Sequence, residues 1–256
     1  MPSVDKALRA VIELAEAGTG GLGLADLADR LSVKRSSLHV TLRALRHRSF
    51  VDQTATGNYV LGSSLLAVAS LYYRNFDLRG ILRPTLLKAA REVNEVFHLA
   101  VLDGSDLLYL ERIESQRPIQ PGTAIGHRLP ALTTAMGRIL VGALYSDFAA
   151  FETRFRGRLN PRTASAPRTL RDEWRFIKLA RQLGYAVDPE HNVPGLAAVA
   201  VAISFKGSPV AAVSIVTLAQ DFYDKGEAHY VDLLHNVLQR DLDVPLELIE
   251  GHPIDP

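Results

Sequence analysis

Hydrophobic positions in the first part of the chain predict a small helical domain that ends in a β-hairpin. Apolar residues recur at the helical period over residues 4–17, 24–31 and 34–48. Ser3 is the predicted N-cap of the first helix, and Gly18 is the residue predicted to end it. Residues 50–62 place apolar side chains on both sides of a polar turn that contains Gly57 and Asn58, a pattern typical of a hairpin.

A short break between the second and third helical segments defines the type of domain. Only residues 32–33 separate the two segments, and two helices joined by so tight a turn form a helix-turn-helix. Leu38, Leu42 and Leu45 follow the helical period and form the predicted buried stripe of the third helix. With the hairpin that follows, this order predicts a winged helix-turn-helix domain over residues 1–62.

Positive charge is concentrated in one segment of this domain. The whole chain has 29 Lys and Arg residues against 28 Asp and Glu residues, a net charge of +1. The segment from residue 30 to residue 48 contains no acidic residue and six basic ones, Arg30, Lys34, Arg35, Arg43, Arg46 and Arg48. Such a run is either a solvated basic face or a surface for a polyanion. The helix-turn-helix order favours the polyanion, since solvated helices usually mix both signs.

A helical projection of residues 34–48 predicts the DNA contacts. Opposite the leucine stripe lie short or hydrogen-bonding side chains and one arginine: Ser36, Val40, Arg43 and His47, with His39 at the flank. Such side chains suit the floor of the major groove. Lys34, Arg35 and Ser37 come at the helix start, where basic groups and backbone N–H groups hold phosphate. In the hairpin, Asn58 and Tyr59 are expected to contact the DNA backbone.

Residues 63–76 form a predicted linker helix with apolar positions such as Leu65, Leu66 and Ala69. Free linkers are polar, so a helix this hydrophobic packs either against the second domain or in the seam of a homodimer or tetramer. We favour the seam, because a helix-turn-helix protein usually presents two recognition helices to a pseudo-palindromic operator in double-stranded DNA.

Residues 77–250 show a mixed helix and strand pattern. Predicted helices cover residues 78–96 with a restart at Pro84, 131–144, 170–182 and 227–239. The third of these has Thr169 as its predicted cap and Gly184 at its end. Two hairpins are predicted, one turning at residues 104–105 and the other at residues 205–208. Hairpins with flanking helices indicate an α+β fold, an antiparallel sheet covered by helices.

Several kinds of site are excluded by composition and motifs. The chain has no cysteine, which excludes disulfides, thiolate zinc sites and iron–sulfur clusters. Glu190, His191 and Asn192, or His127 with His98, lack the spacing of a zinc site. Nucleotide-binding loops and nucleophile elbows are missing as well. We therefore predict no catalytic residue, metal or cofactor. No signal peptide or membrane-spanning run is visible, so we expect a cytoplasmic protein.

Two stretches, KRSSLHVTLRALRHRSFV and GNYVLGSSLL, resemble the winged-helix domain of the IclR family of bacterial transcription regulators. The ending Tyr59-Val60-Leu61-Gly62 keeps the family pattern, whereas Ser49 stands where the family often has glycine. RLPALTTAMGRIL and LGYAVDPEHNVPGLAAVAVAI resemble two segments of the family's effector domain. The resemblance covers residues 3 to about 245. It implies a GAF/PAS-like sheet that cups a small molecule, generally a metabolite or aromatic acid.

The resemblance also implies a set of effector contacts. Backbone N–H groups near Ala135 and Met136 match contacts to a ligand carboxylate, and Asp188 matches an acidic position of the pocket wall. Strand positions expected to face the ligand are Ala198, Ser214 and Val216. Thr134 offers a hydroxyl at a helix start, which suits an anion. The alternatives are a helix cap at Thr134, a turn at Asp188 and strand core at the other positions.

The character of the effector follows from two of these positions. At Ala198 some members have cysteine, and at Val216 many have a hydroxyl, but here both side chains are apolar. The resemblance therefore implies a bulkier and more apolar acid than glyoxylate. The segment HRLPALTTAMGRIL most resembles the branch that regulates aromatic-acid catabolism.

Three hypotheses of function follow. The favoured one is a ligand-responsive transcriptional regulator of a catabolic operon that senses a small organic acid, carboxylate or aromatic. The second is a DNA-binding protein whose C-terminal domain only oligomerises. The third is a domain that acts enzymatically on its ligand. The sequence decides neither between repression and activation nor between dimer and tetramer, and it identifies neither the operator nor the pathway.

Overall fold

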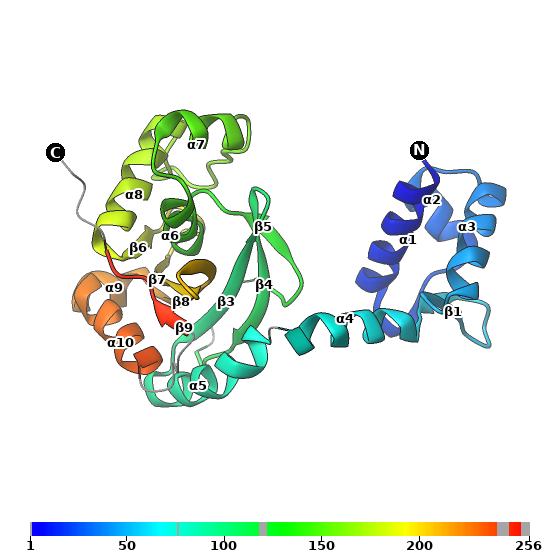
Figure 1. Cartoon of the computed structure of the whole chain (residues 1–256), viewed down its shortest axis with the longest axis horizontal. Coiled ribbons are helices and arrows are strands. Elements are labelled where there is room, and N and C mark those ends of the chain that lie inside the picture. The colour runs from blue at the N-terminus through cyan, green and yellow to red at the C-terminus, as the bar shows by residue number, and fades with distance from the viewer. Residues whose placement is uncertain (1, 76, 118–121, 240–245, 252–256) are drawn as a thin grey trace. The chain divides into compact units, whose positions relative to one another are not determined.

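The computed structural model describes residues 2–75, 77–117, 122–239 and 246–251 (Figure 1). The chain divides into two units, Met1–Leu78 and Arg79–Pro256. Each unit has its own hydrophobic core. Residue 76, the predicted end of the linker helix, lies outside the described residues.

The first unit contains a helix-turn-helix, a hairpin and a helix that follows the hairpin. Its elements are α1 (Ser3–Ala17), a 3₁₀ turn η1 (Gly18–Gly20), α2 (Leu24–Leu31), α3 (Arg35–His47), β1 (Val51–Gln53), β2 (Tyr59–Leu61) and α4 (Ser63–Asn75). The winged helix-turn-helix prediction is confirmed. The tight break between α2 and α3 has Ser32 in the left-handed region, at φ 56°. The predicted cap at Ser3 is wrong, because Pro2 occupies the N-cap position and Ser3 is already helical.

Helix α1 has two apolar stripes rather than one. Ala10 and Leu14 lie in the core with Leu27, Leu38 and Leu42. The second stripe is exposed and follows the same spacing of four residues: Val4, Leu8 and Ile12, which are 70%, 61% and 55% exposed. The sequence pattern did not separate these two groups. The second stripe leaves a hydrophobic strip on the surface of the first unit.

Close backbone contacts fix the wing against the helices. Strands β1 and β2 pair antiparallel, and Tyr59 forms a further antiparallel bridge with Leu22. Ser49 has a φ of 55°, and a side chain at Gly62 would collide with the Ser49 carbonyl. Glycine would adopt this left-handed backbone at position 49 without steric cost.

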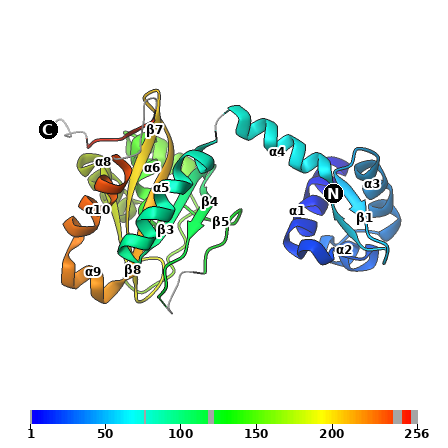
Figure 2. The ribbon, with the colours of Figure 1, turned by 90° about the horizontal axis from the view of Figure 1, so that it is seen from below.

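The second unit is an antiparallel sheet with helices on both faces. Its elements are α5 (Leu78–Val93), β3 (Val96–Asp103), β4 (Asp106–Ile113), β5 (Arg128–Pro130), α6 (Ala135–Leu144), α7 (Phe148–Phe155), α8 (Leu170–Leu183), β6 (Tyr185–Pro189), β7 (Leu196–Phe205), β8 (Ser208–Leu218), α9 (Ala219–Lys225), α10 (Glu227–Gln239) and β9 (Leu246–Leu248). The strand order is β5-β4-β3-β8-β7-β6, and β9 pairs with β7. Helices α5 and α10 cover one face of the sheet, and α6 and α8 lie on the other (Figures 1 and 2).

The sequence of β7 explains how the two faces differ. Small residues at Ala198, Ala200 and Ala202 alternate with the bulkier Val199 and Val201. The alanines face α6, and together with small residues of the neighbouring strands they allow this buried helix to lie close to the sheet. The bulkier side chains form the core on the other face, where α10 contacts β7 and β8.

Some predicted boundaries in this unit are wrong. Helix α5 runs through Pro84 without a restart and ends at Val93, because Asn94 has a φ of 55° and Val96 already begins β3. Helix α6 begins at Ala135 rather than at residue 131, since residues 131–134 form the loop that enters it. The two predicted hairpins, β3–β4 and β7–β8, are confirmed, and so are the caps of α8 at Thr169 and Gly184.

Strand β4 contains a β-bulge. The pairing with β3 shifts so that Ala100 lies opposite Tyr109 and Leu99 lies opposite Glu111, which leaves Leu110 as the extra residue. Tyr109 consequently packs in the core beneath α6. Glu111 is buried and forms ion pairs with Arg79 and Arg83 of α5. The Nε atom of each arginine lies 2.9 Å from the Glu111 carboxylate.

Candidate functional site

Helix α3 presents the predicted DNA-contacting residues to solvent. Leu38 and Leu42 are fully buried, and Leu45 is half-buried, so the stripe fixes which side of the helix faces the core. The predicted contacts on this helix and at its start are all exposed: Lys34, Arg35, Ser36, Ser37, His39, Val40 and Arg43. Lys34 is in the N-cap position with no side-chain cap. The first N–H groups of the helix therefore remain available to an anion.

In the structure, two arginines of this basic segment lie close to carboxylates of other helices. Arg30 lies 3.5 Å from Glu13 of α1, and Arg35 lies 3.9 Å from Asp29 of α2. Arg46 donates to the side chain of Gln53 in the wing. Within the described part of the chain, no carboxylate lies within 4 Å of Lys34 or of the arginines at positions 43, 46 and 48. Positive charge is thus concentrated at the start and along the exposed side of α3.

One residue beside α3 was missed by the sequence analysis. Lys6 of α1 is 7% exposed, and its Nζ lies 2.5 Å from Oγ of Ser37. This contact brings an additional cation to the start of α3. Lys6 follows the same four-residue spacing as Ala10 and Leu14, so it shares the inward stripe of α1. Lys6 could have been predicted only with knowledge of which stripe of α1 faces the core.

Two predicted wing contacts have structural roles in this fold. The Nδ2 group of Asn58 donates to the Gly20 carbonyl at 3.1 Å and connects the wing to η1. Tyr59 is 4% exposed and packs in the core, so its ring has no surface to offer DNA. The exposed part of the wing is instead its tip, residues 55–57. We therefore leave Asn58 and Tyr59 out of the proposed interface.

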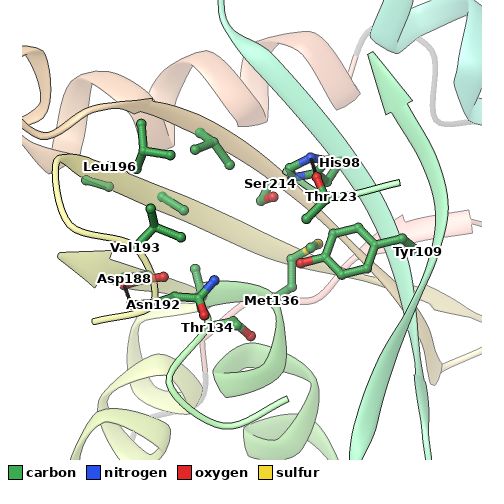
Figure 3. A pocket seen from close by; sticks show the side chains of 14 residues that line it. His98, Tyr109, Thr123, Thr134, Met136, Asp188, Asn192, Val193, Leu196 and Ser214 are labelled. Carbon is green, nitrogen blue, oxygen red and sulfur yellow. Dashed lines mark hydrogen bonds between the residues drawn. The ribbon is translucent and has the colours of Figure 1, made fainter. Parts of the chain in front are cut away.

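A pocket lies between α6 and the sheet of the second unit (Figure 3). Its cavity volume is about 50 Å³. The predicted effector residues all line it: Thr134, Ala135, Met136, Asp188, Ala198, Ser214 and Val216. Further lining residues were not predicted: His98, Tyr109, Thr123, Asn192, Val193, Leu196 and Ala197. The walls are mostly apolar with a few polar groups, which is typical of small-molecule sites.

Strand register brings the pocket residues of the sheet together. Asp188 of β6 pairs with Ala198 of β7, which pairs with Val216 of β8. In the neighbouring row, Ser214 of β8 pairs with His98 of β3. Because side chains in register share a face of the sheet, these five residues point to the same side, toward α6.

Helix α6 contributes its N-terminus to the pocket. The Thr134 hydroxyl accepts the N–H of Gly137 at 3.0 Å and donates to the Ala131 carbonyl at 2.7 Å. The N–H groups of Ala135 and Met136 have no partner inside the helix, because they belong to its first turn. Thr134 is thus both the helix cap and a pocket residue. A side chain at Gly137 would collide with the Ala131 backbone, so glycine permits this tight entry.

A buried ion pair supports the pocket from behind. Arg138 and Glu173 are 1% and 0% exposed, and Glu173 accepts from Nε and Nη2 of Arg138 at 2.8 and 2.9 Å. Arg138 also donates to the Val187 carbonyl at 2.6 Å and contacts Nδ1 of His191 at 2.8 Å. Its guanidinium lies 4.4 Å from the centre of the Phe176 ring. The charge of Arg138 is therefore neutralised by Glu173.

Asp188 is the acidic group of the pocket. Its Oδ1 accepts the N–H groups of His191 and Asn192, so it also caps the turn after β6. Burial raises the pKa of the Asp188 carboxyl to about 7, although the charge of Arg138 and the two N–H donors oppose this effect. Near neutral pH this group is therefore available in both its charged and its neutral form.

Two aromatic side chains close the other end of the pocket (Figure 3). His98 and Tyr109 meet edge to face with ring centres 5.2 Å apart, and Nε2 of His98 lies 2.7 Å from the Thr123 hydroxyl. Burial lowers the pKa of His98 to about 3, with a smaller contribution from Arg112, so the imidazole is neutral. Burial also raises the pKa of the Tyr109 phenol. This end therefore offers neutral hydrogen-bonding groups and ring edges.

The described residues contain no cluster of three or more His, Cys, Asp or Glu residues that could hold a metal ion. Within the same residues, no helix is both long and apolar enough to cross a membrane. The geometry thus consists of an exposed basic helix in a winged helix-turn-helix and a small-molecule pocket in a separate α+β unit. That combination of a DNA-binding unit and a ligand-binding unit defines a transcriptional regulator.

Comparison with known proteins identifies the family. The family model described as "Bacterial transcriptional regulator IclR C-terminal" matches residues 70–240, and the "IclR helix-turn-helix domain" matches residues 3–55. The chain belongs to the IclR family. It is therefore a DNA-binding transcriptional regulator and not an enzyme, which removes the enzymatic hypothesis.

Individual relatives agree with this assignment. The HTH-type transcriptional regulator XynR of Escherichia coli is 28% identical over 95% of this chain and 98% of its own length. The Pca regulon regulatory protein of Pseudomonas putida is 30% identical over 85% and 74%. The crystal structure of the Thermotoga maritima IclR has a TM-score of 0.70 at 25% identity, covering 92% of this chain and 95% of that one. An IclR homologue of Microbacterium hydrocarbonoxydans complexed with 4-hydroxybenzoate shares the fold, with a TM-score of 0.77 at 20% identity over 90% and 95%.

Proposed function

We propose that this regulator controls a catabolic operon in response to a small organic acid bound between α6 and the sheet. The observation that carries the proposal is the convergence on one pocket of seven residues from four separate segments of the chain. The N–H groups at the start of α6 suit a carboxylate, and the alanine and valine side chains of the sheet suit an apolar body.

An aromatic acid is the effector class that these walls favour. Ala198 and Val216 provide an apolar wall, and the edges of His98 and Tyr109 face the space where a ring would lie. One homologue supports this class, since it is complexed with 4-hydroxybenzoate. Ser214 and Thr123 are then available to hydrogen-bond a ring substituent.

DNA recognition is proposed for α3 and the residues that flank it. Ser36, His39, Val40 and Arg43 would lie toward the base edges of the major groove. At the start of the helix, Lys34, Arg35 and Ser37 would hold phosphates, and the wing tip at residues 55–57 would lie along the backbone.

A dimer is proposed as the DNA-binding form. The exposed stripe of α1, formed by Val4, Leu8 and Ile12, is an apolar strip that a second copy would cover. Helix α4 adds further exposed apolar residues, Leu66, Val68 and Leu71. Two copies would present two recognition helices to the halves of a pseudo-palindromic operator. The alternative packing of α4 against the second unit predicts a monomer in solution.

Ligand binding is tested by titrating the protein with DNA from upstream of its own gene, with and without a panel of acids. The panel contains benzoate, 4-hydroxybenzoate and glyoxylate, and melting temperature is followed in parallel. An effector raises the melting temperature with its concentration and changes DNA affinity, because the two equilibria are coupled. Ser214→Leu should abolish the ligand effect and keep DNA binding. If no acid in the panel has an effect, the second unit only oligomerises and the effector proposal is wrong.

Two substitutions separate base reading from phosphate contact on α3. Arg43→Ala should reduce discrimination between the operator and a scrambled duplex, by about 1–3 kcal/mol. Lys34→Ala should weaken binding to both duplexes equally. It should also reduce the slope of log K against log salt concentration by about 1, the value for one lost phosphate contact. Both proteins should melt like the parent, since both side chains are exposed. Identical behaviour of the two variants would show that the assigned roles are wrong.

A further inference from the structure

Arg162 lies on the loop between α7 and α8, and this loop is fastened to a wall of the pocket. Nη1 of Arg162 donates to Oδ1 of Asn192 at 3.2 Å. The Thr163 hydroxyl donates to the His191 carbonyl, and the Ser165 hydroxyl donates to the Glu190 carbonyl, each at 3.2 Å. The three bonds connect three residues of the loop, within the stretch 162–165, to three consecutive residues of the turn between β6 and β7.

That turn is itself part of the pocket. Asn192 and Val193 line the cavity, and the N–H of Asn192 is bound by Asp188. Glu190 has a φ of 62°, and its carboxylate accepts the N–H of Gly195, which fixes the turn from within. The loop that contains Arg162 therefore lies directly outside the pocket wall, one hydrogen bond away from a lining side chain.

The guanidinium of Arg162 has no carboxylate partner among the described residues. None lies within 4 Å of it, and the one side-chain acceptor found for it is the neutral amide of Asn192. Arg138, on the inner side of the pocket, is by contrast fully paired with Glu173. Arg162 thus keeps a whole positive charge at the pocket wall. Burial and the charge of Asp188 raise the pKa of Tyr109, and the charge of Arg162 partly opposes this rise.

The pocket itself lacks a cation. Its lining contains no Lys or Arg, His98 is neutral, and the one acidic side chain, Asp188, would repel a bound anion when ionised. Backbone N–H groups at the start of α6 provide partial positive charge, but they do not balance a full negative charge. An acid in this pocket therefore needs a counter-ion close by.

We propose that Arg162 is this counter-ion. It attracts an organic anion to the pocket and pairs with its carboxylate beside Asn192, and residues 156–169 act as the outer wall of the site. The inference rests on the proposed effector function and goes further, because it assigns recognition of charge to a residue outside the pocket lining. The ligand class is consequently a carboxylate rather than its neutral amide or ester.

The test compares three variants of the full-length protein. Arg162→Gln removes the charge, and Arg162→Lys keeps it. Arg158→Gln is the matched control, because Arg158 is an exposed arginine of the same loop whose side chain makes no hydrogen bond or ion pair with the described residues of the pocket wall. Dissociation constants are measured by calorimetry for the panel acid with the largest thermal shift and for its neutral amide. For 4-hydroxybenzoate, the neutral partner is 4-hydroxybenzamide.

Arg162→Gln should bind the acid about fivefold more weakly at low salt, and the difference should fade toward about 1 M salt, where charges are screened. Arg162→Lys should restore most of the affinity, and Arg158→Gln should behave like the parent. Affinity for the amide should be the same in all four proteins. If the parent binds acids and Arg162→Gln matches Arg158→Gln at every salt concentration, the counter-ion proposal alone is wrong. If the parent binds no acid of the panel, the effector proposal fails and this inference fails with it.

Discussion

Removing Glu173 should destabilise the second unit strongly, because Arg138 would be left with a buried and uncompensated charge. The two residues are 0% and 1% exposed, and Glu173 accepts both Nε and Nη2 of Arg138. Glu173 also accepts the backbone N–H of Thr133 at 3.1 Å, in the loop that enters α6. Substitution by Leu would remove all three acceptor contacts at once.

The magnitude follows from this geometry. Breaking a buried pair by removing one partner costs about 3–5 kcal/mol, mainly because the other charge remains buried. The Val187 carbonyl and the His191 ring still contact Arg138, which favours the lower half of that range, about 3–4 kcal/mol. For a unit of this size, about 2–4 °C in melting temperature corresponds to 1 kcal/mol, so Glu173→Leu should melt roughly 6–16 °C below the parent.

The assay is equilibrium denaturation followed by fluorescence. The chain has a single tryptophan, Trp174, which stacks on Phe151 and is adjacent to Glu173, so its emission reports on the second unit alone. Arg138→Met, Glu173→Leu and the double variant complete a double-mutant cycle. The double variant should be less destabilised than the sum of the two singles by about 2 kcal/mol or more, because it contains no unpaired charge. Additive effects would refute the argument that the pair is coupled.

Three further predictions concern other parts of the molecule. The pKa of Asp188 is raised from 3.8 to about 7, so the folded chain binds more protons than the unfolded one between these values. The free energy of unfolding should therefore fall by up to about 4 kcal/mol as pH rises from about 4 to 7. Asp188→Asn should make the free energy of unfolding less dependent on pH, as followed by Trp174 fluorescence. An unchanged pH dependence in this variant would argue against the shifted pKa. Gly137→Ala should prevent the chain from entering α6 normally and should lower the melting temperature sharply. Gly142→Ala should lower it less, because its new methyl group would meet the Ile177 carbonyl at 3.0 Å. Equal losses in melting temperature would contradict the close approach at residue 137. Leu8→Glu should produce a monomer by light scattering and weaken operator binding with little change in melting of the isolated chain; a dimer of normal affinity would show that the α1 stripe is not the seam.

Periodicity identified the elements of the first unit but not the direction in which each side of α1 faces. Lys6, Ala10 and Leu14 have the same spacing as Val4, Leu8 and Ile12. The first stripe contains a lysine, so hydropathy favours the second as the core, yet the structure buries the first. The choice depends on where α3 and the wing lie, and that is a tertiary property that no local pattern encodes.

The pocket was predicted best where the chain resembles its family and least where loops contribute. Residues at the start of α6 and on the inner face of β8 were identified in advance and lie on one cavity. Thr123 and Asn192 come from irregular segments without a period, so nothing in the sequence placed them there. Tyr109 was missed for a different reason. Buried positions alternate along β4 without interruption, and only the β-bulge places Tyr109 and Glu111 on opposite faces of the sheet.

This bulge also restricts how the protein can vary in length. Because Leu110 is an extra residue, Tyr109 reaches the ligand side of the sheet while Glu111, two positions later, reaches α5 on the opposite side. Deletion of a single residue here would turn one of the two side chains to the wrong face, and so would an insertion. Among relatives, we therefore expect loops at the ends of β4 to gain and lose residues freely, while the interior of this edge-proximal strand keeps its count. A strand with two different partners on its two faces evolves by substitution, not by change of length.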